Sequence, residues 1–350
     1  MDSVITDLDA LNQKLAGSSI PKELLEKAQI RIDQLKKMTD SPTFLPEFDR
    51  LNKYIDWIIS IPWGNATKDI LDLVHAKEVL DSHHFGLDDI KDRVLEYISV
   101  MKLKKERPLK TGAANNRAPI LCFVGLVGTG KTTIASSIAQ SLDRKFARIP
   151  FGGMEDPLDL RGLSRMHPEA EPGKVIKALV SAGSFNPVIL LDEIDRVTEK
   201  GRSSVMGVLV ELLDPEQNHS FTDYYLDYPV DLSSVLFVAT ANNTHSIATA
   251  VMDRLEPILM PSYTDHEKIV IGQKYMLPKL LEQSGLTQGS FSIADDVWPL
   301  IVRPLGFDAG IRTLQRNIEG AVRKAARMII EGKKQKVEVN SQNVKEFLPS

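Results

Sequence analysis

Residues 125–132 read Gly-Leu-Val-Gly-Thr-Gly-Lys-Thr and fit the pattern G-x-x-x-x-G-K-[ST]. The apolar run 120–124 comes directly before them and predicts a buried strand, while residues 132–142 place apolar side chains on one helical face. A glycine-rich loop between a strand and a helix directs backbone N–H groups and the positive end of the helix dipole at one point. The stretch therefore predicts a phosphate-binding loop, and it constrains the chain to an α/β fold built around that loop.

The nucleotide-binding residues that we predict from this loop are Gly125, Leu126, Val127, Gly128, Thr129, Gly130, Lys131, Thr132 and Thr133. In such a loop the lysine reaches the β- and γ-phosphates, and the hydroxyl of the following residue binds Mg²⁺. We assign these two roles to Lys131 and Thr132. The expected cofactors are accordingly ATP and Mg²⁺.

The composition favours a soluble globular protein, because 43% of the 350 residues are hydrophobic and 26% are charged. The net charge of −4 gives no overall electrostatic reason to expect nucleic acid or an anionic membrane as a partner. No apolar run approaches the roughly 20 residues of a membrane-spanning helix, and residues 1–4 do not begin a secretory signal. The single cysteine, Cys122, is expected to pack in the core, which suits a reducing compartment.

Apolar residues recur at helical spacing through the first hundred residues and predict an all-helical region with helices at 21–39, 46–61, 72–81 and 87–105. The segment 106–118 contains Pro108 and Gly112 and few apolar residues, so we interpret it as a linker.

From residue 119 onwards, short apolar runs alternate with helical segments, which predicts a parallel sheet with crossover helices. The predicted strands are 120–124, 145–150, 187–191 and 235–240. After Pro261 we expect no further strands, only helices at 264–283, 293–303, 309–331 and 341–347. The predicted fold is α/β, divided into an N-terminal helical region (1–105), a linker (106–118), a nucleotide-binding domain (119–260) and a small helical domain (261–350).

Polar side chains follow two of these apolar runs. Asp192 and Glu193 come after the run 188–191, where two acids can simply mark the exit of a strand. Beside a phosphate-binding loop they predict instead that Asp192 holds Mg²⁺ through water and that Glu193 activates the attacking water. Asn242 ends the run 235–241 and is expected to sense the γ-phosphate, whereas Asn243 is of a type that more commonly starts a turn.

Two arginines complete the set of candidate catalytic residues. Arg254 lies shortly after the last predicted strand, where an arginine can reach the nucleotide of a neighbouring subunit. A surface salt bridge is the commoner use of any one arginine, and that alternative stays open. Arg312 lies in Asp-Ala-Gly-Ile-Arg-Thr-Leu (308–314), at the start of the long C-terminal helix, from which it can fold over the nucleotide.

Together these five signals resemble an AAA+ ATPase, and more narrowly the ATPase module of Lon-type ATP-dependent proteases. The block Leu-Leu-Asp-Pro-Glu-Gln-Asn at 212–218 is the most specific part of this resemblance. Further matching segments lie at 54–57, 60–64, 84–87, 220–223, 235–243, 263–264, 267–268 and 309–314. The resemblance covers nearly the whole chain, from about residue 20 to residue 347.

The resemblance implies a P-loop AAA+ sheet with a helical lid, and it implies a role for each candidate residue. Asp192 and Glu193 correspond to the metal-holding acid and the catalytic base, Asn242 to sensor 1, Arg254 to the arginine finger and Arg312 to sensor 2. The residues that fall where the family encloses adenine are His84, Phe85, Gly86, Leu87 and Tyr263. Family members assemble as homo-hexamers that pull unfolded or damaged proteins through a central pore.

The sequence departs from the family in three respects. Leu126 and Val127 stand where the family usually has two prolines. The pore-loop run 165–173, Arg-Met-His-Pro-Glu-Ala-Glu-Pro-Gly, places His167, Pro168, Glu169 and Glu171 where the family has an aromatic residue, an aliphatic residue and glycine to grip substrate, and residues 201–205 lack a second pore-loop motif. No segment resembles the peptidase domain that would follow residue 350, so we expect this chain alone not to cleave peptides.

The resemblance favours the ATP-hydrolysing, substrate-remodelling module of a Lon-like protease. The expected location is the cytoplasm, and neither a membrane nor, as a primary partner, nucleic acid is expected. Two alternatives stay open: a stand-alone AAA+ remodelling factor, and a nucleotide-gated scaffold that no longer translocates substrate. A clamp loader or helicase is disfavoured by the acidic net charge and by the block at 212–218.

Overall fold

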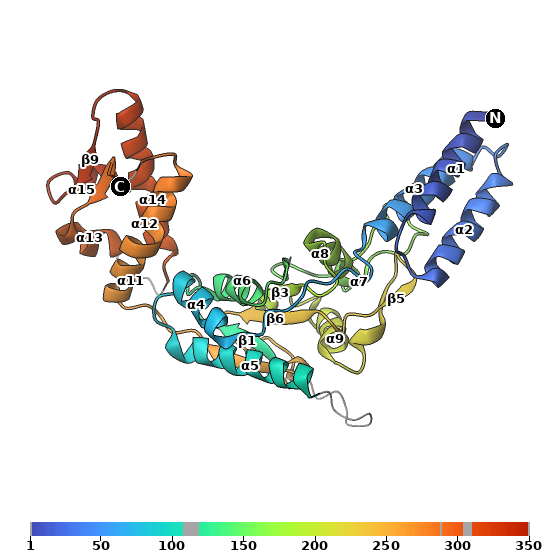
Figure 1. Cartoon of the computed structure of the whole chain (residues 1–350), viewed down its shortest axis with the longest axis horizontal. Helices are drawn as coiled ribbons and strands as arrows, with labels where there is room; N and C mark the ends of the chain where they lie inside the picture. The colour runs from blue at the N-terminus through green and yellow to red at the C-terminus, as the bar shows by residue number, and fades with distance from the viewer. Residues whose placement is uncertain (1, 108–118, 288, 304–309, 349–350) are drawn as a thin grey trace.

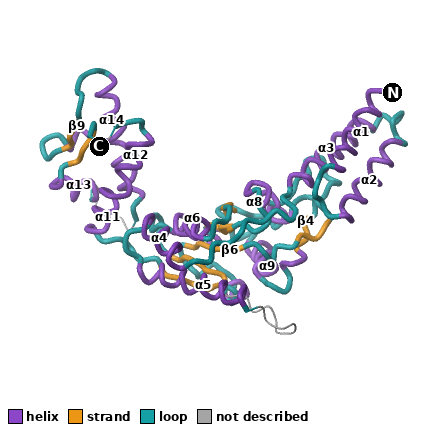
Figure 2. Tube along the Cα trace, in the orientation of Figure 1, coloured by secondary structure: helices purple, strands orange, loops and turns teal. Residues whose placement is uncertain are grey.

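A computed structural model describes residues 2–107, 119–287, 289–303 and 310–348. Figure 1 shows three parts in a row: an α/β centre, an arm of N-terminal helices on one side and a C-terminal helical unit on the other. The tube in Figure 2 shows that most of the strands lie in the centre, with helices around them. The predicted linker 106–118 lies almost entirely outside the described residues.

The central sheet has five parallel strands in the order β2-β3-β6-β1-β7. Four of them confirm the predicted strands to within one residue: β1 (Ile120–Val124), β2 (Phe146–Pro150), β3 (Val188–Asp192) and β6 (Leu236–Ala241). The fifth, β7 (Leu255–Leu259), was not predicted, because Glu256 and Pro257 interrupt its apolar pattern. Proline is tolerated there because β7 is an edge strand, with one side free of ladder hydrogen bonds.

The two faces of the sheet belong to separate hydrophobic cores. Leu121 and Phe123 pack with α4 (Leu73–His83), α5 (Asp88–Glu106) and α6 (Lys131–Ser141). Cys122 and Val124 point to the other face, which packs with α8 (Lys174–Ala182) and α9 (Arg202–Leu213). The helices α4 and α5 therefore share a core with the sheet, although the proposed domain boundary separates them from it. The division at residues 105, 118 and 260 stays a prediction.

Short elements complete this second face. They are the helix α7 (Leu158–Arg161), the antiparallel pair β4 (Phe221–Asp223) and β5 (Tyr228–Val230), the helix α10 (Thr249–Met252), and 3₁₀ turns at Ile194–Arg196 and Asn218–Ser220. The pair β4–β5 was not predicted, because each strand has only three residues.

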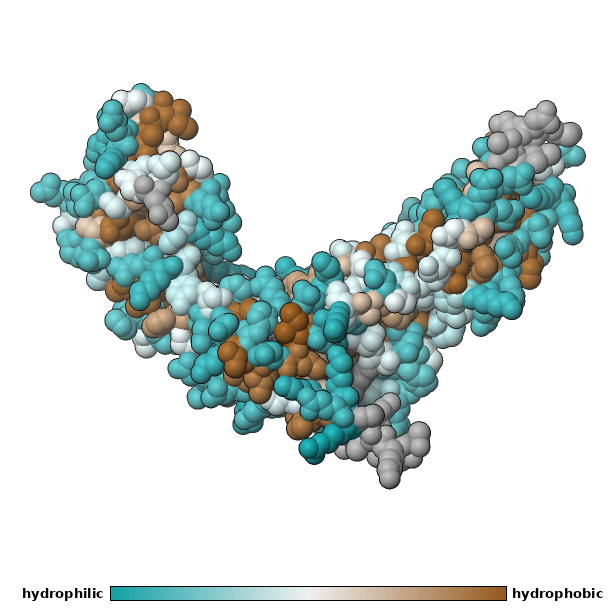
Figure 3. All heavy atoms as spheres, viewed as in Figure 1, coloured by the Kyte–Doolittle hydropathy of each residue, from teal (hydrophilic) through white to brown (hydrophobic). Residues whose placement is uncertain are grey.

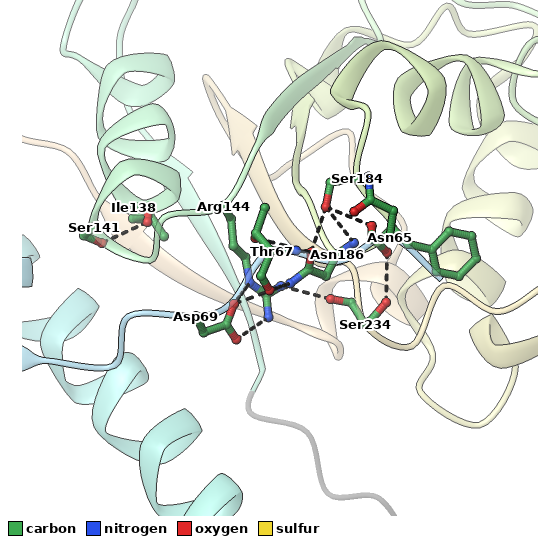
Figure 4. Close-up of polar contacts among 10 residues, drawn as sticks. Asn65, Thr67, Asp69, Ile138, Ser141, Arg144, Ser184, Asn186 and Ser234 are labelled. Carbon is green, nitrogen blue, oxygen red and sulfur yellow. Dashed lines mark hydrogen bonds and ion pairs between the residues drawn. The ribbon is translucent and has the colours of Figure 1, made fainter. Parts of the chain in front are cut away.

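The arm consists of α1 (Asp2–Ala16), α2 (Lys22–Lys36) and α3 (Phe44–Ser60), of which α2 and α3 were predicted and α1 was not. A polar network holds the segment after α3 against the edge where the sheet strands begin (Figure 4). Both carboxylate oxygens of Asp69 accept hydrogen bonds of 2.8 Å from Arg144, which also donates to the Ser234 carbonyl. The Thr67 N–H donates to Asn186 Oδ1 at 2.8 Å, and Asn186 Nδ2 donates back to the Thr67 carbonyl.

The C-terminal unit has its own core, built by α11 (Asp265–Ile271), α12 (Leu277–Gln283), α13 (Trp298–Val302), α14 (Arg312–Ile330) and α15 (Val344–Phe347). A π-helical turn at Gly272–Met276 joins α11 to α12, and a 3₁₀ turn at Asp295–Val297 precedes α13. The prediction that strands end at Pro261 was wrong, because β8 (Phe291–Ile293) pairs in parallel with β9 (Val337–Val339). Three residues are too few for an alternating pattern to stand out.

The face in Figure 3 is mostly hydrophilic, with hydrophobic side chains gathered over α4 and α5. Exposed apolar residues of these helices include Val74 and Leu103. Among the described residues, no helix combines the length and the apolar character needed to cross a membrane.

Candidate nucleotide-binding site

The predicted phosphate-binding loop leaves the carboxyl end of β1 and leads into α6. Gly128 and Gly130 have φ values of 85° and 94°, which favour glycine because they lie in the left-handed region. A Cβ atom on Gly125 would lie 2.8 Å from the Met260 carbonyl oxygen, so this position also excludes larger residues. The strand–loop–helix context expected from the sequence is therefore confirmed.

Lys131 of this loop is hydrogen bonded to Asn242, which follows β6. The Lys131 ammonium group donates to the carbonyls of Gly125 (2.5 Å) and Leu126 (2.9 Å) and to Asn242 Oδ1 (3.1 Å). Burial lowers the Lys131 pKa, and the charges of nearby carboxylates, Asp195 first among them, partly offset this. The Asn242 Nδ2 atom is buried and has no hydrogen-bond partner among the described residues. A buried donor of this kind favours a ligand oxygen beside it, because an unmade hydrogen bond costs about 1–3 kcal/mol.

The two predicted acids are positioned by a residue that the sequence analysis missed. The Thr240 hydroxyl, buried on β6, donates to Asp192 Oδ1 and accepts the Glu193 backbone N–H at 2.9 Å. Asp192 ends β3, is only 4% exposed, and has Arg148 2.5 Å from its other oxygen. Glu193 has a φ of 57°, and its carboxylate lies 3.4 Å from Arg196. No local pattern singles out Thr240 in the apolar run before Asn242, and its role follows only once β6 is placed beside β3.

Asn243 takes the alternative role left open by the sequence. Its side-chain oxygen accepts the His245 N–H at 3.1 Å, as in a turn that an asparagine starts. Its own Nδ2 donates to Asp195 Oδ2 at 3.3 Å. Asn243 therefore shapes the loop after β6.

The C-terminal unit contacts the phosphate-binding loop directly. The Ile311 N–H donates to the Gly128 carbonyl at 3.0 Å, and a Cβ atom on Gly128 would lie 3.3 Å from Arg312 Cγ. The Tyr263 hydroxyl donates to the Thr129 carbonyl at 3.2 Å, and burial raises the Tyr263 pKa to about 12. Arg312 and Tyr263 therefore both lie against the phosphate-binding loop.

A cavity of about 480 Å³ lies beside the loop, between α4, α6 and the C-terminal unit. Its lining includes the predicted residues His84, Phe85, Gly130, Thr133 and Tyr263, together with Tyr275, Met276 and Ile311. Gly86 and Leu87 do not line this cavity; Leu87 packs against the α4–α6 core instead. The His84 ring is 2.9 Å from the Ser137 hydroxyl, and burial lowers its pKa to about 4, so it is neutral at pH 7.

Arg254 lies at the opposite edge of the sheet from this loop. Its carbonyl accepts the N–H of Ile120 at the start of β1, whereas the loop follows the end of β1. Its side chain donates to Asp214 Oδ2 and to the Ala250 carbonyl, both at 2.7 Å. The structure thus gives Arg254 an ion pair within the chain and does not bring it to the chain's own phosphate-binding loop.

The site offers few protein ligands for a metal. Among the residues that the structure describes, no group of three or more His, Cys, Asp or Glu side chains is placed to hold an ion. Mg²⁺ commonly needs only one or two protein oxygens beside substrate phosphates and water. Thr132 in the phosphate-binding loop and Asp192 at the end of β3 could supply these oxygens, and Asp192 would do so through water, because Thr240 and Arg148 already contact its two oxygens.

Comparisons with known proteins relate the sequence to two protein families. Residues 121–263 match the ATPase family associated with various cellular activities (AAA), and residues 282–337 match the Lon protease AAA+ ATPase lid domain. A Lon protease of Bacillus thuringiensis is 40% identical over 342 residues, which are 98% of this chain and 42% of that protein. A Lon protease of Elusimicrobium minutum is 41% identical over 347 residues, which are 99% of this chain and 40% of that protein.

The chain therefore spans about two fifths of the length of these curated relatives. The resemblance inferred from the motifs is confirmed. Residues 121–263 are an AAA ATPase domain, of a family that binds and hydrolyses ATP, and the lid domain of Lon proteases follows at residues 282–337.

Proposed function

We propose that this chain is the ATP-hydrolysing module of a Lon-like protease and that hydrolysis drives the unfolding and translocation of protein substrates. One observation carries the proposal. Lys131 and Asn242 are hydrogen bonded at 3.1 Å, and Thr240 joins Asp192 and Glu193 on the neighbouring strand ends. The parts needed for phosphoryl transfer thus meet at one edge of the sheet.

Each residue would contribute to in-line attack of water on the γ-phosphate. Lys131 exchanges its contacts with loop carbonyls for phosphate oxygens, and Glu193 accepts the proton of the attacking water. Asn242 donates its unpaired Nδ2 hydrogens near the γ-phosphate. Asp192 and Thr132 would hold Mg²⁺, which when bound neutralises charge on the phosphate oxygens. Because Arg148 and Thr240 already contact the two Asp192 oxygens, Asp192 would hold the metal through water.

The position of Arg254 supports assembly into a homo-hexamer. An arginine at the edge where the strands begin is remote from its own phosphate-binding loop, and it would exchange its pair with Asp214 to reach the loop of a neighbouring copy. In that arrangement Arg254 would act in trans, and Arg312 would couple the nucleotide to the lid. The peptidase would be supplied by the rest of a longer chain, and unfolded or damaged proteins would be the substrates.

The loop 163–172 favours a second candidate, a remodelling factor or nucleotide-gated scaffold with impaired translocation. Its tip exposes Met166 at 87%, and Pro168 and Glu169 are also exposed. Its base is held by the Leu163 N–H donating to the Glu171 carbonyl at 3.0 Å and by the pair between Glu171 and Lys177. A fixed, acidic loop is poorly suited to gripping an extended chain.

The test is the ATPase rate with and without an unfolded protein such as casein, comparing the natural sequence with Glu193→Gln. We expect hydrolysis that needs Mg²⁺, rises with casein and is lost in Glu193→Gln, which should still bind ATP. A hydrolysis rate that does not change when casein is added would favour the scaffold. Absence of hydrolysis despite ATP binding and ring assembly would refute the proposed motor.

A further inference from the structure

A second cavity, of about 230 Å³, lies between the N-terminal arm and the loop 163–172. Helices α2 and α3 form one wall, and residues 165, 167, 168 and 170 of the loop form the other. This cavity, which we call the arm pocket, is separate from the nucleotide-binding site: none of its lining residues lines the cavity beside the phosphate-binding loop. A volume of this size accommodates about one large side chain.

The floor of the arm pocket is apolar and rigid. Leu35, Leu51, Tyr54 and Tyr225 line it, and all four are buried in the core that unites the arm with the sheet. The Tyr54 and Tyr225 rings are 6.0 Å apart, and the Tyr54 hydroxyl donates to the Leu226 carbonyl at 3.4 Å. Such a floor favours an apolar group on the ligand.

The rim of the arm pocket is positively charged. Arg31, Arg50, Lys53 and Arg165 line it, against the single acid Glu47. Glu47 is paired with Arg50 at 2.9 Å, which leaves three positive charges without a close carboxylate in the pocket lining. Among the described residues, neither Arg31 nor Lys53 has an ion-pair partner within 4.0 Å.

Arg165 is held at this rim by the arm itself. Its guanidinium group lies 4.1 Å from the centre of the Tyr54 ring, a cation–π contact, and its nearest carboxylate is Asp227 at 3.9 Å. Stacking fixes the guanidinium plane but leaves its N–H groups available, so Arg165 is ordered before a ligand binds. Pre-ordering of this kind lowers the entropic cost of binding an anion.

From this geometry we propose that the arm pocket binds an acidic segment of a polypeptide, with one apolar side chain on the floor and its flanking carboxylates at Arg31, Lys53 and Arg165. The net positive charge of the rim, to which Arg31 and Lys53 contribute without an ion-pair partner among the described residues, complements a run of carboxylates, and the apolar floor favours a peptide over a simple anion. Because the loop 163–172 forms one wall, a bound segment contacts both the arm and this loop. This inference rests on the proposed function in one respect, namely that the ligand is a polypeptide. Binding to the arm pocket itself requires no ATP hydrolysis.

The test is the direct binding of a fluorescein-labelled peptide of alternating Glu, Leu, Gly and Ser residues, followed by anisotropy at low salt. We expect binding to the natural sequence and affinity about five-fold weaker in Arg31→Glu and in Lys53→Glu, because each reversal replaces an attraction by a repulsion. The matched control is Lys22→Glu, an exposed lysine on α2 outside the pocket lining, which should bind normally. Thermal unfolding of each variant checks that the fold is retained.

Four outcomes would overturn the proposal. A peptide with Gln in place of Glu binds equally well, or Lys22→Glu weakens binding as much as the two rim variants do. Inorganic phosphate alone displaces the peptide as strongly as unlabelled peptide does, which would assign the rim to small anions. If the natural sequence self-associates without peptide and Arg31→Glu does not, the pocket would be assigned to a second copy of the chain. ATPase activity of the natural sequence, measured in parallel, tests the proposed function separately.

Discussion

Replacing Thr240 by valine tests the geometry of the candidate site most directly. Valine keeps the shape of threonine but lacks the hydroxyl, which here donates to Asp192 and accepts the Glu193 N–H. Thr240 is fully buried, so water cannot easily replace these two bonds. The substitution therefore acts on both acids at once without changing the phosphate-binding loop.

The size of the effect follows from the two bonds that are lost. A hydrogen bond to a charged group contributes about 1.5–3 kcal/mol, and a buried backbone N–H left unpaired costs about 1–3 kcal/mol. Glu193 is partly exposed, so the cost of leaving its N–H unpaired should lie at the lower end of that range. We expect a loss of about 2–4 kcal/mol in the free energy of unfolding. Because Glu193 is then less well oriented, the kcat for ATP hydrolysis should fall about 10–100-fold, the range seen when partners of ligating groups are removed.

The assay compares kcat at saturating ATP with the affinity for a fluorescent nucleotide. In Thr240→Val, kcat should fall while nucleotide affinity changes little, since Lys131 keeps its partners. Thr240→Ser is the matched control, because serine restores the hydroxyl and should recover most of the rate. An unchanged kcat in a folded Thr240→Val protein would refute the idea that Thr240 positions the acids. An equal loss in Thr240→Ser would attribute the effect to packing instead.

Two further predictions concern stability. Asp69→Ala leaves the buried Arg144 guanidinium without its carboxylate and should cost about 3 kcal/mol in urea unfolding; Glu96→Ala, which breaks the exposed pair with Arg93, should cost less than about 1 kcal/mol. Equal effects of the two variants would contradict this reasoning. Burial raises the Asp223 pKa from 3.8 to about 6, although three backbone N–H groups oppose the shift. The folded state therefore holds this proton more tightly than the unfolded state, so stability should fall by about 3 kcal/mol as the pH rises from about 4 to about 6 and then level off. Asp223→Asn, measured by urea midpoints over the same range, should lack this fall, and an identical pH profile in the variant would count against it.

The central strands could be predicted because buried parallel strands are continuous apolar runs. The runs at 120–124 and 188–191 have no charged residue, and each leads into a polar loop that carries the chemistry. The phosphate-binding loop and the acids Asp192 and Glu193 could be identified for the same reason. Their positions are set by local sequence and by the rule that parallel strands end at one edge of the sheet.

The remaining features depend on contacts that a sequence pattern does not carry. The strand β7 contains Glu256 and Pro257, which are tolerated only because β7 lies at the edge. Thr240 resembles any small residue in an apolar run until β6 is placed beside β3. The pairing of Arg254 with Asp214 joins residues 40 positions apart at the edge where the strands begin. Each of these features follows from strand order, which local pattern leaves undetermined.

The direction of β1 separates the phosphate-binding loop from Arg254, which is why we propose that Arg254 acts on a neighbouring copy. The phosphate-binding loop follows the end of β1, and Arg254 sits beside the start of the same strand, so the length of the strand separates them. The lid meets the loop through the carbonyls of Gly128 and Thr129, which accept the Ile311 N–H and the Tyr263 hydroxyl. These carbonyls belong to the same peptide backbone whose N–H groups would hold phosphate. A shift of the loop on nucleotide binding would therefore move the hydrogen-bond partners of Ile311 and Tyr263, whereas the Arg254 side chain is hydrogen bonded to Asp214 and Ala250. Under the proposed function, residues 263 and 311 would couple the nucleotide to the lid, and residue 254 would couple neighbouring copies.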